Sequence, residues 1–107
     1  MKTDIEAPRD LGIAIRAARK AQRLRQDDAA GSIGVSESFL GKVENGAEGV
    51  HWGKLFRVLE SLGVKVSVDL PDAAIALLEL ERDKLARREA RVRQRASQAP
   101  GDAGEPQ

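Results

Sequence analysis

The side chains that could carry chemistry in this 107-residue sequence do not form a catalytic pattern. The chain has one histidine, His51, and no cysteine. We find no nucleophile paired with a base, as covalent catalysis requires, and no residues with metal-ligand spacing. His51 begins an amphipathic segment, where a structural role is the simpler interpretation. We therefore predict a protein that is not an enzyme and has no metal or cofactor.

Charge is distributed unevenly along the chain, although the formal net charge is only +1. One stretch contains five cations and no acid among them: Arg16, Arg19, Lys20, Arg23 and Arg25. A local basic stripe of this kind is enough to follow a phosphate backbone. The glycines lie at predicted helix ends rather than in a phosphate-cradling loop after a strand.

The segment from Gln26 to Gly46 has the pattern of two short helices joined by a tight turn. Gly34 suits the end of the first helix because glycine enters the left-handed backbone region without a Cβ penalty. Ser36 suits the start of the second, since its hydroxyl can accept a hydrogen bond from an orphan backbone N–H. Ala30 allows the helices to cross closely. The pattern predicts a helix-turn-helix, with a plain helical hairpin as the alternative.

The same segment resembles the helix-turn-helix of the lambdoid-repressor (Xre, or Cro) family. The matching positions are Gln26, Asp27-Asp28, Ala29-Ala30, Gly34-Val35-Ser36 and Glu44-Asn45-Gly46. The resemblance implies an all-α fold with a compact four-helix DNA-binding domain. Three residues depart from the family pattern: Arg25 replaces a capping Thr or Ser, Ala29 replaces a larger aliphatic residue, and Glu37 replaces Gln, Lys or Arg.

In this motif, the second helix presents its N-terminal residues to base edges, while the preceding helix crosses the DNA backbone. Carried over by position, the resemblance assigns base contacts to Ser36, Glu37, Ser38 and Lys42. It assigns phosphate contacts to Gln26, at a helix N-terminus, and to Arg25 and Asn45. The alternative for each is an ordinary exposed side chain, and for Ser36 it is a helix cap alone.

The family also pairs the positions of Arg19 and Glu44, tying the first helix to the end of the recognition helix. We expect an ion pair with a structural role, the alternative being two independent surface charges. The first helix is expected to be capped by Asp10 and to bury Leu11, Ile15 and Ala18, with the basic stripe on its exposed face.

A fourth helix is predicted from about His51 to Leu62, ending at Gly63. The next seven residues, Val64–Leu70, alternate between apolar and polar side chains, which predicts a short β-strand. A lone strand cannot satisfy its own backbone. We therefore expect it to pair with the same strand of a second copy, with Val64, Val66 and Val68 at the dimer interface.

The segment Leu55–Gly63, followed by the alternating residues and Pro71, resembles the HipB type of antitoxin. That resemblance implies a homodimeric repressor that binds an inverted-repeat operator in double-stranded DNA, controls its own operon and binds a HipA-like kinase toxin. The alternatives are a stand-alone regulator without a toxin partner and a protein-interaction adaptor that does not read DNA.

The expected organisation is a flexible N-terminus (1–8), a helix-turn-helix domain with its strand (9–70), a helical tail (71–98) and a disordered end (99–107). The tail carries a thin apolar stripe, which fits a solvated helix, a short coiled coil or a partner-binding arm. The stripe consists of Ile75, Leu78, Leu85 and Val92. Without cysteine, an apolar secretion segment or a membrane-spanning run, we expect a soluble cytoplasmic protein.

Overall fold

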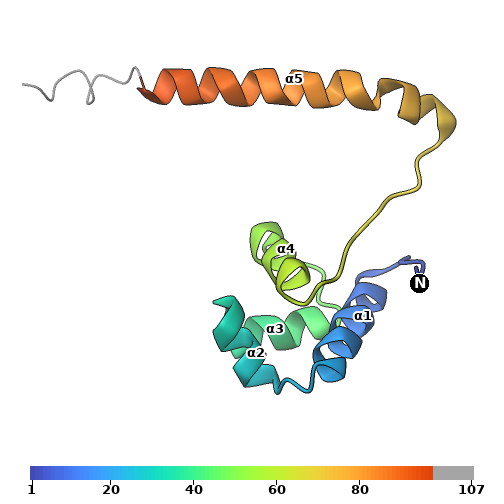
Figure 1. The fold of residues 1–107 in the computed structure, drawn as a ribbon, viewed down its shortest axis with the longest axis vertical. Helices are drawn as coiled ribbons and strands as arrows, with labels where there is room; N and C mark the ends of the chain where they lie inside the picture. The colour runs from blue at the N-terminus through green and yellow to red at the C-terminus, as the bar shows by residue number, and fades with distance from the viewer. Residues whose placement is uncertain (98–107) are drawn as a thin grey trace, which may run out of the picture. The chain divides into compact units, whose positions relative to one another are not determined.

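The computed structural model describes residues 1–97, and this part of the chain contains five helices and no strand (Figure 1). The helices are α1 (Pro8–Ala21), α2 (Gln26–Ile33), α3 (Glu37–Glu44), α4 (Trp52–Ser61) and α5 (Asp72–Ser97). They divide between two units, Met1–Ser67 with α1 to α4, and Val68–Gln107 with α5. The disordered end that the sequence predicted, at 99–107, lies outside the described residues.

The predicted β-strand at Val64–Leu70 is wrong, because this segment has no regular secondary structure. Within the chain, a single extended segment has no neighbouring strand to satisfy its backbone. Its first residue is used differently: the Val64 N–H donates to the Leu59 carbonyl at 2.9 Å, completing the end of α4. The alternation of apolar and polar residues therefore does not indicate a strand here. The fold is all-α.

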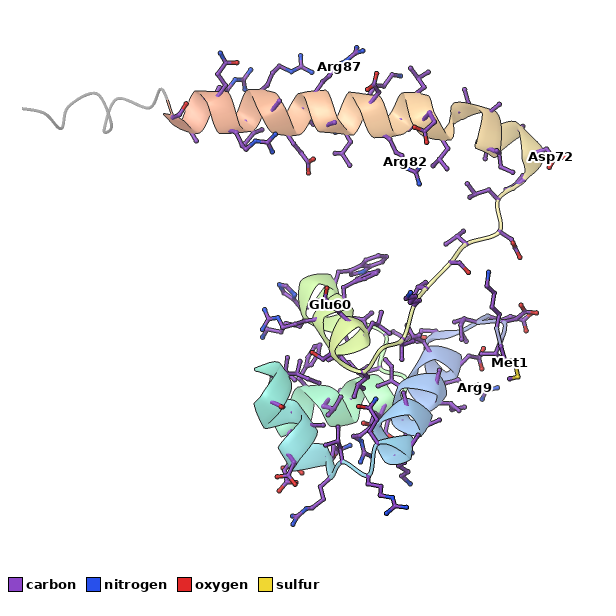
Figure 2. All side chains as sticks on the ribbon, in the orientation of Figure 1. Met1, Arg9, Glu60, Asp72, Arg82 and Arg87 are labelled. Atoms are coloured by element: carbon purple, nitrogen blue, oxygen red, sulfur yellow. The ribbon has the colours of Figure 1, made fainter. Side chains whose placement is uncertain are left out.

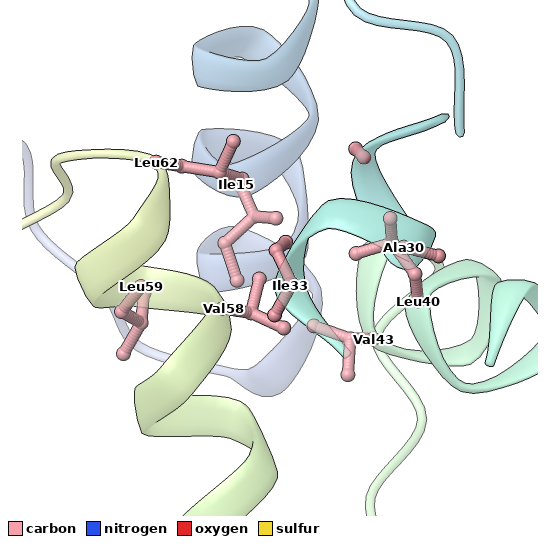
Figure 3. Close-up of a cluster of buried hydrophobic side chains, with 9 residues drawn as sticks. Ile15, Ala30, Ile33, Leu40, Val43, Val58, Leu59 and Leu62 are labelled. Carbon is pink, nitrogen blue, oxygen red and sulfur yellow. The ribbon is translucent and has the colours of Figure 1, made fainter. Parts of the chain in front are cut away.

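The first unit has one apolar core, to which all four of its helices contribute (Figure 3). Its buried members are Ile15, Ala29, Ala30, Ile33, Leu40, Val43, Val58, Leu59 and Leu62. Ala30 is only 2% exposed, as expected at a close approach of α2 and α3. Leu11 and Ala18, predicted to be buried on α1, are partly buried against this core.

Helix α1 begins at Pro8, earlier than the predicted start, and Asp10 lies inside the helix rather than before it. The Asp10 Oδ2 atom accepts hydrogen bonds from the backbone N–H groups of Glu6 and Ala7, each at 3.0 Å. A carboxylate at this position satisfies orphan donors and complements the positive end of the helix. Proline is suited to the first turn because its missing N–H is not needed there.

The turn of the predicted helix-turn-helix is formed by Gly34, whose φ is 90°. Its N–H and that of Val35 both donate to the Ala30 carbonyl, at 2.9 and 3.0 Å. Helix α1 ends differently, since the left-handed residue after it is Arg23, with φ 58°. A side chain in that region costs free energy that glycine avoids. The turn after α1 is therefore less favourable locally than the turn between α2 and α3.

Candidate nucleic-acid interface

Helix α3 begins with an exposed polar end. The Ser36 Oγ atom accepts a hydrogen bond from the Phe39 N–H at 3.0 Å, so this residue is the N-cap. Glu37, Ser38 and Lys42 are all exposed. All four predicted base-contacting residues are thus on the solvent side of one helix, which is the arrangement that a groove-reading helix requires.

The opposite face of α3 fixes this orientation. Leu40 is fully buried and Val43 is 5% exposed, and both belong to the core beneath α3. Side chains three and four residues apart lie on the same helical face. Because Leu40 and Val43 must stay buried, Ser38 and Lys42 on the opposite side of the helix must remain outside, and Glu37 is exposed in the first turn.

The structure brings together Arg19 and Glu44, which the resemblance paired. Arg19 Nε donates to Glu44 Oε2 at 2.7 Å, and Arg19 Nη2 donates to Glu44 Oε1 at 2.9 Å. Their side chains are only 9% and 0% exposed. Arg19 Nη1 also donates to the Leu24 carbonyl at 2.8 Å. Arg19 is therefore not part of an exposed basic stripe, because its guanidinium is occupied inside the domain.

Two further side chains bind the same carboxylate. Arg16 Nε and Gln26 Nε2 both donate to Glu44 Oε1 at 3.2 Å. Arg16 Nη2 also donates to Asn45 Oδ1 at 2.7 Å. We call Arg16, Arg19, Gln26 and Glu44 the Glu44 cluster; it joins α1, α2 and α3.

The contacts around Glu44 change the roles that were predicted for two DNA-binding residues. Gln26 and Asn45 were assigned to phosphate, and each side chain is instead held partly by the protein. Asn45 is bound through its oxygen, so its amide nitrogen remains a donor. The role of Arg16 was missed, although it lies one helical turn before Arg19 and therefore on the same face of α1. That spacing is the signal that could have identified it.

Charge in the Glu44 cluster is balanced by hydrogen bonds. Burial alone would raise the pKa of Glu44, but the hydrogen bonds from Arg19, Arg16 and Gln26 hold the pKa below its usual value. The hydrogen bond to Glu44 raises the pKa of Arg19. Both side chains therefore remain ionised at neutral pH, and the buried charge is compensated.

A glycine allows α1 to approach the end of α3 so closely. A Cβ atom added at Gly12 would lie 2.5 Å from the Val43 carbonyl oxygen and 2.6 Å from that of Glu44. These are backbone atoms of α3 and cannot move independently of the helix. The role of Gly12 was not predicted, since a glycine within a helix gives no sign of what packs against it.

Positive charge lies before α2 and, from α4, beside the turn and α3. Arg25, the residue before α2, is exposed and forms an ion pair with Asp27 at 3.1 Å. Two cations of α4, Lys54 and Arg57, were not predicted from the sequence. Lys54 Nζ lies 5.8 Å from the centre of the Phe39 ring, and Arg57 Nη1 donates to the Gly34 carbonyl at 3.4 Å. Helix α4 therefore adds positive charge beside the turn and α3.

Within residues 1–97, no group of three or more His, Cys, Asp or Glu side chains is placed to hold a metal ion. No helix in that range combines the length and apolar character needed to cross a membrane. His51 is the N-cap of α4, where its Nδ1 accepts a hydrogen bond from the Lys54 N–H at 3.1 Å. The only histidine is thus occupied by a structural contact.

Comparison with known proteins supports the same fold. The chain is 38% identical over 71 residues to y4mF of Sinorhizobium fredii, an HTH-type transcriptional regulator, and the match covers 66% of this chain and 93% of y4mF. Solved structures of a HipA-HipB-O2-O3 complex and a HipB-O4 20mer complex contain similar chains, with TM-scores of 0.59 and 0.58. Both are 22% identical, and both matches cover 64% of this chain and 97% of the other.

The likeness to the HipB structures shows the fold. Two matches show that the sequence itself is related to known proteins: the match to y4mF, and a family model for the helix-turn-helix domain that matches residues 10–70. That range contains α1 except its first two residues, all of α2 to α4, the Glu44 cluster and every residue assigned to DNA. The chain belongs to the helix-turn-helix domain family.

Proposed function

We propose that this protein is a sequence-specific DNA-binding repressor of transcription that reads an operator through the exposed end of α3. One observation carries the proposal: Ser36, Glu37, Ser38 and Lys42 are exposed on a helix whose other face is fixed in the core. Hydrogen-bonding groups held in one orientation can discriminate base edges in the major groove. Lys54 and Arg57, beside this end, add positive charge that favours phosphate.

Selection of binding sites from a random DNA library, followed by affinity measurements at several salt concentrations, tests this proposal. We expect one preferred sequence and an affinity that falls with salt, by about 0.9 in log–log slope for each phosphate neutralised. Removing a good base or phosphate contact with Lys42→Ala should weaken binding by about 1–3 kcal/mol. Lys84→Ala, an exposed lysine on α5, is the matched control. Equal affinities for all DNA, with no salt dependence, would favour a protein-interaction adaptor.

A homodimer on an inverted-repeat operator is part of the proposal. Two copies related by a two-fold axis would place their recognition helices about 34 Å apart, one turn of DNA. Val66 and Val68 are candidates for the contact, being 50% and 72% exposed. Val66 also lines an apolar groove of about 290 Å³ with Trp52 and Phe56. Val64 is partly buried against the core, so it has less surface to offer a second copy.

Sedimentation of Val66→Lys tests the contact. A charged side chain in an apolar interface is unfavourable, so we expect this variant to sediment as a smaller species than the wild type at equal concentration. Lys65→Ala, one residue away, controls for the loss of a nearby side chain. Unchanged sedimentation of Val66→Lys would remove Val66 from the interface.

The finer part of the proposal is that this repressor is the antitoxin of an operon and binds a HipA-like kinase. The support is the fold shared with HipB chains, one of them solved together with HipA. A kinase-like protein encoded by a neighbouring reading frame should form a complex with this chain during gel filtration. A repressor that binds its operator but not that kinase would be a stand-alone regulator.

A further inference from the structure

Helix α5 carries an apolar stripe that nothing within the helix covers. Leu78, Leu85 and Val92 are spaced seven residues apart, and Ile75 lies one turn before the first of them. The exposed fractions are 51% for Leu85, 55% for Ile75 and 59% for Val92, and no residue of α5 is buried. A seven-residue apolar repeat is the pattern of a helix that packs along another helix.

The stripe also contains two charged residues. A seven-residue repeat has two core positions, and Leu78, Leu85 and Val92 share one of them. Arg82 lies seven residues after Ile75, and Glu89 lies seven after Arg82, so both share the other core position with Ile75. Charged residues at core positions weaken a pair of helices unless each meets an opposite charge, and they thereby select register and orientation.

Charge divides α5 into two halves (Figure 2). Residues 72–83 contain four acids and one cation, Asp72, Glu79, Glu81, Arg82 and Asp83. Residues 84–97 contain six cations and one acid, Lys84, Arg87, Arg88, Glu89, Arg91, Arg93 and Arg95. The first half is therefore negative and the second strongly positive.

The helix's own needs explain only part of this division. Favourable interaction with the helix dipole is confined to the first and last turns, whereas Glu79, Glu81 and Arg88 lie well inside. Ion pairs within α5 use Arg82, Lys84 and Arg87, which bind Glu79, Glu81 and Asp83. Among the described residues, the four other arginines of α5 form no ion pair. They are Arg88, Arg91, Arg93 and Arg95.

We propose that the stripe of α5 packs against α5 of a second copy of this chain, with the two helices antiparallel. A parallel pair would place Arg82 against Arg82, Glu89 against Glu89, and the two basic halves side by side. An antiparallel pair places each acidic half beside a basic half. Like charges that face each other destabilise a helix pair, whereas opposite charges stabilise it.

The spacing fits this orientation. Leu78 and Val92 are each seven residues from Leu85, so a two-fold axis at Leu85 places Leu78 level with Val92 of the second copy. The same axis brings Arg82 within one residue, about 1.5 Å along the helix, of Glu89 of the second copy. The 26 residues of α5 extend for about 39 Å. This proposal goes beyond DNA reading and does not rest on it.

Cysteine cross-linking in the full chain tests both contact and orientation, because the natural sequence has no cysteine. Chains with Leu78→Cys and chains with Val92→Cys are mixed and oxidised. Antiparallel helices should join the two kinds of chain, and should do so about tenfold or more faster than freely diffusing chains at micromolar concentration, since paired thiols have millimolar effective concentrations. Ala76→Cys, on the opposite face of α5, gives the rate for free collision.

Two results would overturn the proposal. Cross-links of 78 to 78 and 92 to 92 in preference to 78 to 92 would show parallel helices. Cross-linking no faster than that of Ala76→Cys would show that a second α5 does not cover the stripe, and would leave it to a different protein. DNA affinity of the same reduced variants is measured separately, so loss of α5 pairing and loss of DNA reading are distinguishable.

A charge-reversal experiment provides a second measurement. Glu79→Lys with Glu81→Lys makes both halves of α5 basic, so the 78-to-92 cross-link between such chains should be lost. Arg88→Glu, Arg91→Glu, Arg93→Glu and Arg95→Glu together make the other half acidic as well, and should have the same effect. Mixing the two reversed chains should restore the cross-link. If reversal leaves the rate unchanged in each separate chain, charge complementarity does not hold the helices together.

Discussion

At its carboxyl end, α3 is held by the buried Glu44 cluster, whereas at its amino end Glu37 and Ser38 are exposed to solvent. The helix has eight residues, so these two environments are only about 12 Å apart. In the part of the chain that the structure describes, every buried side-chain nitrogen or oxygen has a hydrogen-bond partner. One short helix therefore separates the residues that hold its position from those that are available for recognition.

Substitutions at the two ends of α3 should have different effects. Changes at Arg19 or Glu44 should affect the free energy of unfolding, and affect DNA binding only because less protein is folded. Changes at Glu37 or Ser38 should affect DNA preference and leave the core intact.

Arg19→Met should destabilise the fold most. It removes two hydrogen bonds from a fully buried carboxylate, and an uncompensated buried charge costs about 3–5 kcal/mol. Arg16 and Gln26 still bind Glu44, so the lower part of that range is expected. Denaturant unfolding of Arg19→Met, Glu44→Gln and the double variant forms a double-mutant cycle. Strictly additive losses would mean that the two side chains do not interact.

Acid should weaken the fold through the same carboxylate. The folded-state pKa of Glu44 lies below its ordinary value, so its contribution to stability is complete above about pH 4.3, the usual pKa of an unfolded glutamate. The contribution is lost as the pH falls through the lower, folded-state pKa. Unfolding free energies measured from pH 7 downward should decline there for the wild type and decline less for Glu44→Gln. Parallel curves for the two proteins would contradict this assignment.

Gly12→Ala should destabilise by about 1–3 kcal/mol, because the new methyl group would press against two carbonyl oxygens of α3. The matched control is Gly31→Ala. A Cβ atom at Gly31 would meet nothing within 4 Å, so the better helix propensity of alanine should stabilise that variant by up to about 1 kcal/mol. Melting temperatures that shift in the same direction for both variants would show that the close approach at Gly12 is unimportant.

Glu37→Gln tests the exposed end. A carboxylate only accepts hydrogen bonds, and the major-groove donor that suits it is the N4 amino group of cytosine. If Glu37 reads cytosine, discrimination at one base pair of each half-site should fall by about 1–3 kcal/mol. Stability should fall by no more than about 0.3–1 kcal/mol, the value of a negative charge in the first turn of a helix. Identical site preferences for both proteins would exclude the base-reading role.

The helix-turn-helix could be predicted from the sequence because each of its signals determines the structure of its own neighbouring residues. Gly34 permits one turn, Ser36 caps one helix, and the apolar spacing of α3 selects its buried face. The Glu44 cluster was only half identified, since Arg16 and Gln26 reach it from two different helices. The contact of Gln26 depends on how α2 and α3 pack, which residue spacing within one helix does not specify, whereas Arg16 shares the face of α1 that carries Arg19.

The predicted strand failed for a related reason. Alternation at Val64–Leu70 describes an extended chain with two unlike faces, but a strand also needs a neighbour with which to form hydrogen bonds. The neighbour is not specified by the segment itself. Lys54 and Arg57 were not predicted either. Their spacing was visible in the sequence, but their proximity to Phe39 and Gly34 depends on the packing of α4.

Trp52, the only tryptophan, is 73% exposed and stacks on Phe56 with ring centres 5.8 Å apart. Because the chain has no tyrosine, its near-ultraviolet emission comes almost entirely from this one ring. The indole is already in water when the protein is folded, so loss of the core should shift the emission wavelength very little. A blue shift would instead report that something has covered the aromatic pair, which makes the natural chain its own optical sensor for association at α4.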